Sequence, residues 1–168
     1  MKKTFFTPFA IILVLLAVCL CACSGEKKGA VSMYDLKNTM AGATESFSDM
    51  TYASSEDSDA QSIFENISDM DYSKLDSFFV YYATNGTGNS DEIVVIQVKR
   101  DADISIAKQA LEAHLQKRIA LYSTYDKSQL TKLNAGKIET EGNCVALIVC
   151  DDTQEVSKAF HSFFNADK

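Results

Sequence analysis

Apolar residues recur along this chain with two different periods, which predicts a domain that mixes helices and strands. A repeat of three to four residues predicts amphipathic helices, and dense β-branched or aromatic runs predict strands. Helical patterns cover residues 31–43, 62–68, 101–122 and 153–164. Residues 123–133 add one further short helix to this prediction.

The strand patterns form two pairs, and a turn-like segment joins the members of each pair. The pairs are residues 73–84 with 91–99, and residues 135–140 with 143–150. Asn and Gly, the residues that tight turns favour, dominate positions 85–90, and Glu141-Gly142 joins the second pair. Each pair is therefore expected to form a β-hairpin. Residues 45–61 are polar and have no clear period, so we predict a loop there.

Hairpins followed by amphipathic helices favour the α+β class. We expect a single domain over residues 31–168, with a four-stranded antiparallel sheet built from the two β-hairpins. The helices are expected to pack on one face of this sheet. The single proline of the chain, Pro8, lies outside this domain, which fits a prediction of regular elements.

The N-terminus has the layout of an export signal. Lys2 and Lys3 precede an apolar run over residues 9–20, and small residues follow it. The run is shorter than the roughly 20 residues that a lasting transmembrane helix needs. A signal peptide over residues 1–22 that is removed is therefore favoured over a retained membrane span.

Cys23 is the candidate lipid-attachment residue. The segment Leu20-Cys21-Ala22-Cys23 resembles the bacterial lipobox, with a leucine three positions before the modified cysteine and a small residue directly before it. Cys19 and Cys21 follow bulky residues and are expected to leave with the signal peptide. A diacylglycerol on the thiol and an acyl group such as palmitate on the new amino terminus would anchor the protein stably. Residues 23–30 would then be a short flexible tether at the outer face of the cytoplasmic membrane.

The charge balance limits the partners. The 168 residues carry a formal net charge of -7, with a sequence pI near 4.8. Such a chain lacks the basic surface that binds phosphate backbones, so nucleic acid is not an expected partner. Anionic headgroups would repel the acidic domain, and the membrane is expected to be contacted through the lipid anchor alone.

No residue pattern identifies a catalytic, cofactor or metal site. His114 and His161 are the two histidines, and neither has a second ligand four residues away. Cys144 and Cys150 share one expected strand at roughly 20 Å separation, which excludes a disulfide between them there. Small packing residues are the favoured reading of these cysteines, and reactive thiols are the alternative. The acidic groups fit helix caps and turns better than a calcium loop.

One expected strand carries aromatic residues on both faces. Phe79 and Tyr81 alternate with Phe78 and Tyr82, so the two pairs point in opposite directions. These four residues form a candidate interaction surface, because exposed aromatic rings are enriched at interfaces. A central strand that is covered on both faces is the alternative.

Several local patterns together resemble a known family. Asp91-Glu92-Ile93 opens a strand, the long helix ends near Tyr125-Asp126, and Asn134-Ala135 follows. Gly142-Asn143-x-Val145 then leads a strand into Asp151-Asp152. With the lipobox, these residues are similar over about 33–164 to lipoproteins of domain-of-unknown-function family 4358 from low-GC Gram-positive bacteria. Such proteins commonly have an aromatic residue where this chain has Cys144, and a proline after the tyrosine that is absent here. The resemblance implies a localisation and a fold pattern, and it implies no catalytic residue.

We therefore expect a lipid-anchored extracytoplasmic protein that acts as a binding or protein-interaction module, with an envelope protein as a candidate partner. One alternative is a small envelope enzyme that uses His114 or His161 with a carboxylate brought near by folding. It requires a concave site in which the histidine lies within hydrogen-bond reach of a perturbed acid. Another alternative is an accessory solute-binding lipoprotein.

Overall fold

A computed structural model describes residues 31–84 and 88–166. These residues belong to one compact unit, Val31–Lys168. The expected signal peptide (1–22), Cys23 with its tether (23–30) and part of the first hairpin turn (85–87) lie outside the described residues. Within the described part of the chain, no helix combines the length and the apolar character that crossing a bilayer demands.

The helices and strands that the sequence predicts are present within a few residues of their expected bounds, with one strand in addition. The described helices are α2 (Met33–Ala41), α3 (Ala60–Ile67), α4 (Ile104–Tyr125), α5 (Leu130–Asn134) and α6 (Thr153–Asn165). The strands are β1 (Met50–Ser54), β2 (Leu75–Ala83), β3 (Glu92–Val98), β4 (Lys137–Glu141) and β5 (Cys144–Val149). Short 3₁₀ turns at Tyr72–Lys74, Asp101–Asp103 and Lys127–Gln129 precede β2, α4 and α5.

The sheet has five strands, so the prediction of four was wrong. Its order is β1-β2-β3-β5-β4, and all neighbours are antiparallel. The extra strand, β1, lies inside the segment that the sequence predicted as a loop. Its five residues sit at the sheet edge, where they need only one strand partner, and four of them are partly exposed. A short polar edge strand of this kind carries little hydrophobic periodicity, because pairing with β2 defines it.

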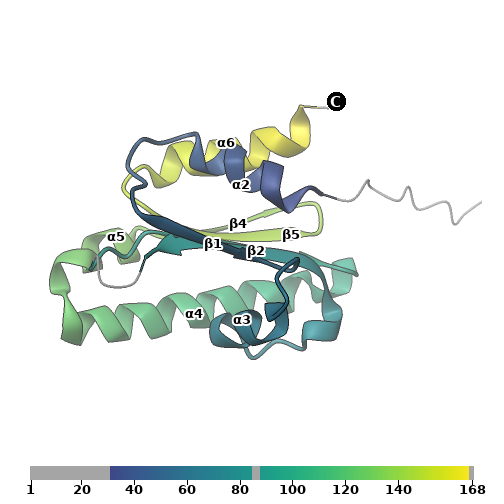
Figure 1. Ribbon diagram of the computed structural model, residues 1–168, viewed down its shortest axis with the longest axis horizontal. Helices are drawn as coiled ribbons and strands as arrows, with labels where there is room; N and C mark the ends of the chain where they lie inside the picture. The colour runs from purple at the N-terminus through teal and green to yellow at the C-terminus, as the bar shows by residue number, and fades with distance from the viewer. Residues whose placement is uncertain (1–30, 85–87, 167–168) are drawn as a thin grey trace, which may run out of the picture. The chain divides into compact units, whose positions relative to one another are not determined.

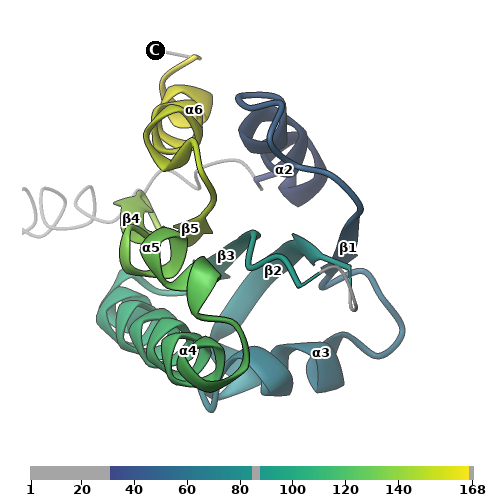
Figure 2. The same cartoon turned by 90° about the vertical axis from the view of Figure 1, so that its left-hand side faces the viewer.

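Helices cover both faces of the sheet, so the expectation of helices on one face was also wrong. Helices α2 and α6 lie on one side, and α3, α4 and α5 lie on the other (Figures 1 and 2). All seven residues of β3 are buried, without the alternation of a half-exposed strand. Continuous apolar runs such as Ile93–Ile96 are typical of strands that are covered on both faces.

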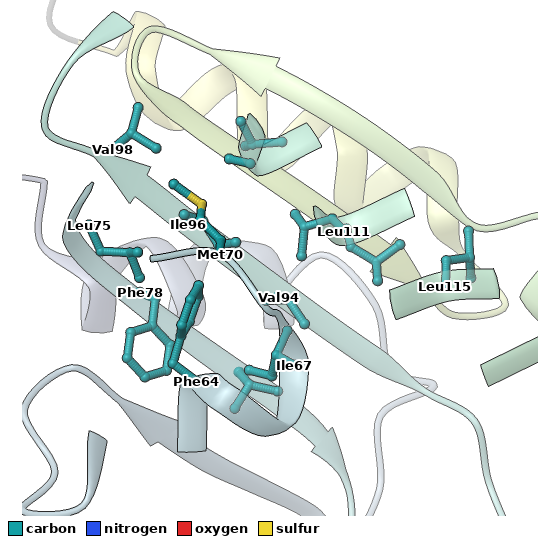
Figure 3. Close-up of a cluster of buried hydrophobic side chains, with 14 of the residues drawn as sticks. Phe64, Ile67, Met70, Leu75, Phe78, Val94, Ile96, Val98, Leu111 and Leu115 are labelled. Atoms are coloured by element: carbon teal, nitrogen blue, oxygen red, sulfur yellow. The ribbon is translucent and has the colours of Figure 1, made fainter. Parts of the chain in front are cut away.

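Each face has its own hydrophobic core, and alternate residues of the central strands supply them. On the α3–α4 face, Phe64 of α3 and Phe78 of β2 lie with ring centroids 5.3 Å apart, and Leu111 of α4 belongs to the same cluster (Figure 3). On the other face, Leu36 of α2 and Phe160 of α6 belong to the second core. Both cores are free of solvent at these residues. The three-layer arrangement therefore fixes the direction of every side chain along β2 and β3.

Candidate functional site

A pocket of about 430 Å³ opens between α3, α4 and the sheet. Its volume is within the range of small-molecule sites. Helix α3 provides one wall, the strands provide the floor, and α4 provides the other wall. The lining residues are Asp59, Ile63, Asn66 and Ile67 from the α3 segment, Ala53, Val80, Tyr82 and Glu92 from the strands, and His114 from α4.

Two lining residues of this pocket, Glu92 and His114, belong to a buried group that Arg118 completes. We call Glu92, His114 and Arg118 the charged trio. Oε2 of Glu92 lies 3.0 Å from Nε2 of His114 and accepts a hydrogen bond of 2.6 Å from Nη1 of Arg118. Nη2 of Arg118 also donates to the carbonyl oxygen of Ser90 at 3.1 Å. Among the described residues, none bonds to Nδ1 of His114 or donates to Oε1 of Glu92. Both atoms therefore keep hydrogen-bonding capacity that a ligand could use.

Local periodicity places the trio. Glu92 is the first residue of β3, and its side chain points to the same face as Val94 and Ile96 because strand side chains alternate. His114 and Arg118 are four residues apart on α4, so they lie on one side of that helix above Glu92. Arg118 continues the three- and four-residue spacing of Leu111 and Leu115 along this helix. A basic residue on an otherwise apolar stripe is the signal from which a buried ion pair could have been inferred.

Two opposing effects act on the Glu92 carboxyl group. Burial alone would raise its pKa, because a carboxylate loses hydration in a low-dielectric environment. The hydrogen bond from His114 and the positive charge of Arg118 outweigh burial, and the pKa of Glu92 lies below its ordinary value. Glu92 is thus ionised at neutral pH.

The arrangement can perform two kinds of chemistry. A carboxylate that orients an imidazole is the geometry of acid–base catalysis, and a charged floor beneath apolar walls is the geometry of ligand binding. A metal site has no support in the described ranges, 31–84 and 88–166, because they contain no cluster of three or more His, Cys, Asp or Glu side chains suited to an ion.

His161 also lies beside carboxylates, on the α6 face of the sheet. Its Nδ1 is 3.0 Å from Oε2 of Glu141, and its Nε2 is 3.4 Å from Oε2 of Glu139. Ser157 donates to the other oxygen of Glu139 at 2.8 Å. These groups join α6 to the edge strand β4, and their ion pairs are more than a quarter exposed. Surface pairs of this kind contribute little to stability.

A third ionic group closes the end of the sheet beside the trio. Nζ of Lys132 in α5 lies 2.6 Å from Asp91 and 3.2 Å from Asp151. Burial would lower the pKa of Lys132, but the carboxylate of Asp91 raises it above the ordinary value. This group attaches α5 to the ends of β3 and β5, and the pocket does not include it.

The four aromatic residues of β2 have different surroundings. Phe78 and Phe79 are each 0% exposed, one in each core. Their role in the folded domain is packing. Tyr81 and Tyr82 are partly exposed on opposite faces, and Tyr82 lines the pocket. The candidate interaction surface is therefore divided between the two sides of the sheet.

Most acidic groups hold turns or ion pairs. Asp71 accepts from the backbone N–H of Ser73, and Asp126 accepts from that of Ser128. The Asp103 side chain makes no cap hydrogen bond to α4, and it accepts hydrogen bonds from Arg100 at 2.8 and 3.1 Å. The sequence predicts helix caps and turns for the acidic groups in general. The ion pair of Asp103 replaces that cap role.

Cys144 and Cys150 are both buried. Burial raises the pKa of Cys150 to about 11, so the thiol is protonated at neutral pH. We expect iodoacetamide at pH 8 to leave Cys150 unmodified in the folded protein and to modify it fully in 6 M guanidinium. Peptide mass spectrometry would measure both fractions. Rapid modification in the folded state would mean that the thiol is accessible and activated.

Comparisons with known proteins support one assignment. Searches of curated proteins and of solved structures returned no match. The family profile described as Domain of unknown function (DUF4358) matches residues 47–150. This range contains all five strands, helices α3 to α5 and the charged trio. The chain therefore belongs to the DUF4358 family.

Proposed function

We propose that this chain is a lipid-anchored binding protein of the cell envelope, and that it holds a small ligand in the pocket between α3 and α4. One observation carries the proposal: Glu92 and His114 of the charged trio line a pocket whose other lining residues are mostly apolar. Burying charges is costly, and apolar residues of similar size often stabilise a fold equally well. Charge retained at the base of a pocket fits a role in holding the polar end of a ligand.

The lining chemistry indicates a class of ligand. Ile63, Ile67 and Val80 suit an apolar body, while the carboxylates of Glu92 and Asp59 accept hydrogen bonds. Both carboxylates carry negative charge, as does the chain as a whole. The pocket therefore suits a small molecule with an apolar body and a hydrogen-bond-donating end, of which a primary amine is the simplest example.

A panel of probes with similar phenyl-bearing skeletons tests the pocket: 2-phenylethylamine, 2-phenylethanol and 3-phenylpropionate. We expect the full chain in a maltoside detergent to bind the amine most tightly and the carboxylate most weakly, measured by calorimetry. Ile63→Trp would fill the pocket and abolish binding. Ile106→Trp is the matched control, because Ile106 is an exposed helical residue outside this pocket. Equal binding by both variants, or no binding of any probe, would contradict the proposal.

A second candidate function is an acid–base enzyme, and the bond between His114 and Glu92 inside the pocket favours it. A binding protein returns its ligand unchanged, whereas an enzyme converts it. Incubation with membrane extract followed by mass spectrometry separates the two. A product formed by the wild-type chain and absent with His114→Gln would support the enzyme in place of the binding protein.

The proposed anchor predicts the behaviour of three cysteine variants. Cys23→Ala is expected to move the protein from the membrane fraction to the soluble fraction, because the lipids would have no attachment residue. Cys19→Ala and Cys21→Ala are the matched controls and are expected to leave the protein in the membrane fraction. Immunoblots of fractionated Gram-positive cells measure the distribution. Unchanged membrane association of Cys23→Ala would favour a retained N-terminal helix.

A further inference from the structure

Three tyrosines surround one ammonium group on the face of the sheet opposite to the pocket. Nζ of Lys37 lies 4.8 Å from the ring centroid of Tyr34 and 5.4 Å from those of Tyr52 and Tyr81. All three distances are within the roughly 6 Å at which a cation is attracted by an aromatic ring. We call Tyr34, Tyr52 and Tyr81 the tyrosine cage.

Three elements position the cage. Tyr52 of β1 and Tyr81 of β2 are direct cross-strand partners, so their side chains leave the same face side by side. Tyr34 of α2 stands edge-on to Tyr52 with centroids 6.1 Å apart and an interplanar angle of 83°. Phe47 packs edge-on against Tyr81 at 5.8 Å. The rings are therefore held in place by packing and not by Lys37 alone.

The cage is open to solvent on one side. Tyr34 is 57% exposed, while Tyr52 and Tyr81 are partly buried. Burial raises the pKa of both Tyr52 and Tyr81, so their hydroxyl groups stay neutral at physiological pH. Because Tyr34 is exposed, a cation can reach the tyrosine cage from solvent without crossing either hydrophobic core.

The polar contacts of Lys37 show which cation suits the cage. Its ammonium donates to Oδ1 of Asn38 at 2.5 Å, and no carboxylate in the described segments forms an ion pair with it. A primary ammonium has three donors and needs acceptors for them. A quaternary ammonium has no N–H donor and requires only aromatic faces. The cage therefore matches a methylated ammonium better than the side chain that now fills it.

We propose that the tyrosine cage is a second ligand site, which binds a small quaternary ammonium group such as that of choline, and that Lys37 is its internal competitor. Lys37 fills the cage because it is tethered there and loses little freedom on binding. An external ligand gains access when this side chain swings into solvent. Its affinity is reduced by the fraction of molecules in which the cage is closed.

Choline chloride is the probe that tests the cage, with the full chain in a maltoside detergent that carries no ammonium group. Lys37→Ala is expected to bind choline at least about tenfold more tightly than the wild type, because the competitor is gone. Lys108→Ala is the matched control, since Lys108 is an exposed helical lysine remote from the cage. Adding Tyr34→Ala to Lys37→Ala is expected to remove the gain. Ile63→Trp is expected to leave choline binding unchanged, which separates this site from the pocket.

Two further probes complete the experiment. The neutral isostere 3,3-dimethyl-1-butanol is expected to bind at least tenfold more weakly than choline, because it lacks the charge that the rings attract. Phosphocholine mimics the headgroup of a lipid or polymer. Comparing its binding with that of choline therefore distinguishes such a headgroup from free choline as the ligand. Equal affinities of choline for the wild type and Lys37→Ala, or equal binding of the neutral isostere, would overturn the proposal. Tyrosine ring signals in NMR spectra would report unfolding of any variant separately from loss of binding.

Discussion

Arg118→Met is expected to lower the free energy of unfolding by about 3 kcal/mol at pH 7, because it leaves the buried Glu92 carboxylate with His114 as its remaining partner. The side chains of Glu92 and Arg118 are 8% and 15% exposed, so water cannot replace the lost hydrogen bond freely. For a domain of this size the melting temperature should fall by roughly 6–12 °C. Urea unfolding followed by circular dichroism measures the change.

The pH dependence identifies Glu92 as the source of this effect. In the wild type the pKa of Glu92 is lowered, so its contribution to stability is present above the ordinary glutamate value of about 4.3 and is lost as the pH falls through the native pKa. Glu92→Gln should remove this part of the acid dependence. The difference in free energy of unfolding between Arg118→Met and the wild type should become smaller as the pH falls from 7 to 4. The reason is that protonation neutralises the Glu92 carboxylate that has lost Arg118.

Two control variants make the Arg118 prediction specific. Glu92→Leu combined with Arg118→Met should be more stable than Arg118→Met alone, because both charges are then absent. Lys158→Met breaks an exposed ion pair with Glu155, and it should cost less than about 1 kcal/mol. Equal losses for Lys158→Met and Arg118→Met would show that the trio is not a buried charged group.

Phe64→Ala is expected to destabilise the domain by about 3–5 kcal/mol, since it leaves a cavity where a fully buried ring now packs. The ring contacts Phe78 at 5.3 Å and Tyr72 at 5.9 Å between centroids. Helix α3 has only eight residues, and Ala60 and Ile67 are its other buried residues. Helix α3 should therefore unfold locally before the sheet does, and the wall of the pocket that it forms would be lost.

Hydrogen exchange would detect this local effect, because the amides of α3 should lose protection before those of β3. Tyr125→Ala is the control, since this ring is 79% exposed on α4 and its removal should change stability by less than about 0.5 kcal/mol. A loss below 1 kcal/mol for Phe64→Ala would mean that α3 is attached to the sheet by other contacts.

Local periodicity was sufficient to predict most of the elements, but it could not predict how they pack. The apolar residues of β3 correctly indicated a strand. Because Ile93–Ile96 follow one another without polar interruption, they are also typical of a strand whose two faces are both covered by helices. The prediction of a sheet covered on one side rested instead on the order of hairpins and amphipathic helices. Strand β1 was missed because its pairing with β2 is a tertiary contact.

The candidate sites depend on contacts between residues far apart in sequence. Arg118 lies at helical spacing from Leu111 and Leu115, but no local pattern identifies its partner, because Glu92 lies 26 positions away. Tyr81 likewise belongs to the aromatic strand that the sequence singles out, whereas its neighbours Tyr34 and Tyr52 come from a helix and from the strand that the sequence did not predict. Long-range geometry of this kind is set by strand register and helix packing.

An NMR titration of the full chain with 2-phenylethylamine tests the central proposal, ligand binding in the pocket, most directly. The account predicts that chemical shifts change at the methyl groups of Ile63, Ile67 and Val80 and at the ring of His114. The signals of Ile67, Val80 and His114 should stay unchanged when Ile63→Trp is titrated. Shift changes confined to the tyrosine cage or to other surfaces, or changes that persist around the pocket in Ile63→Trp, would contradict the account.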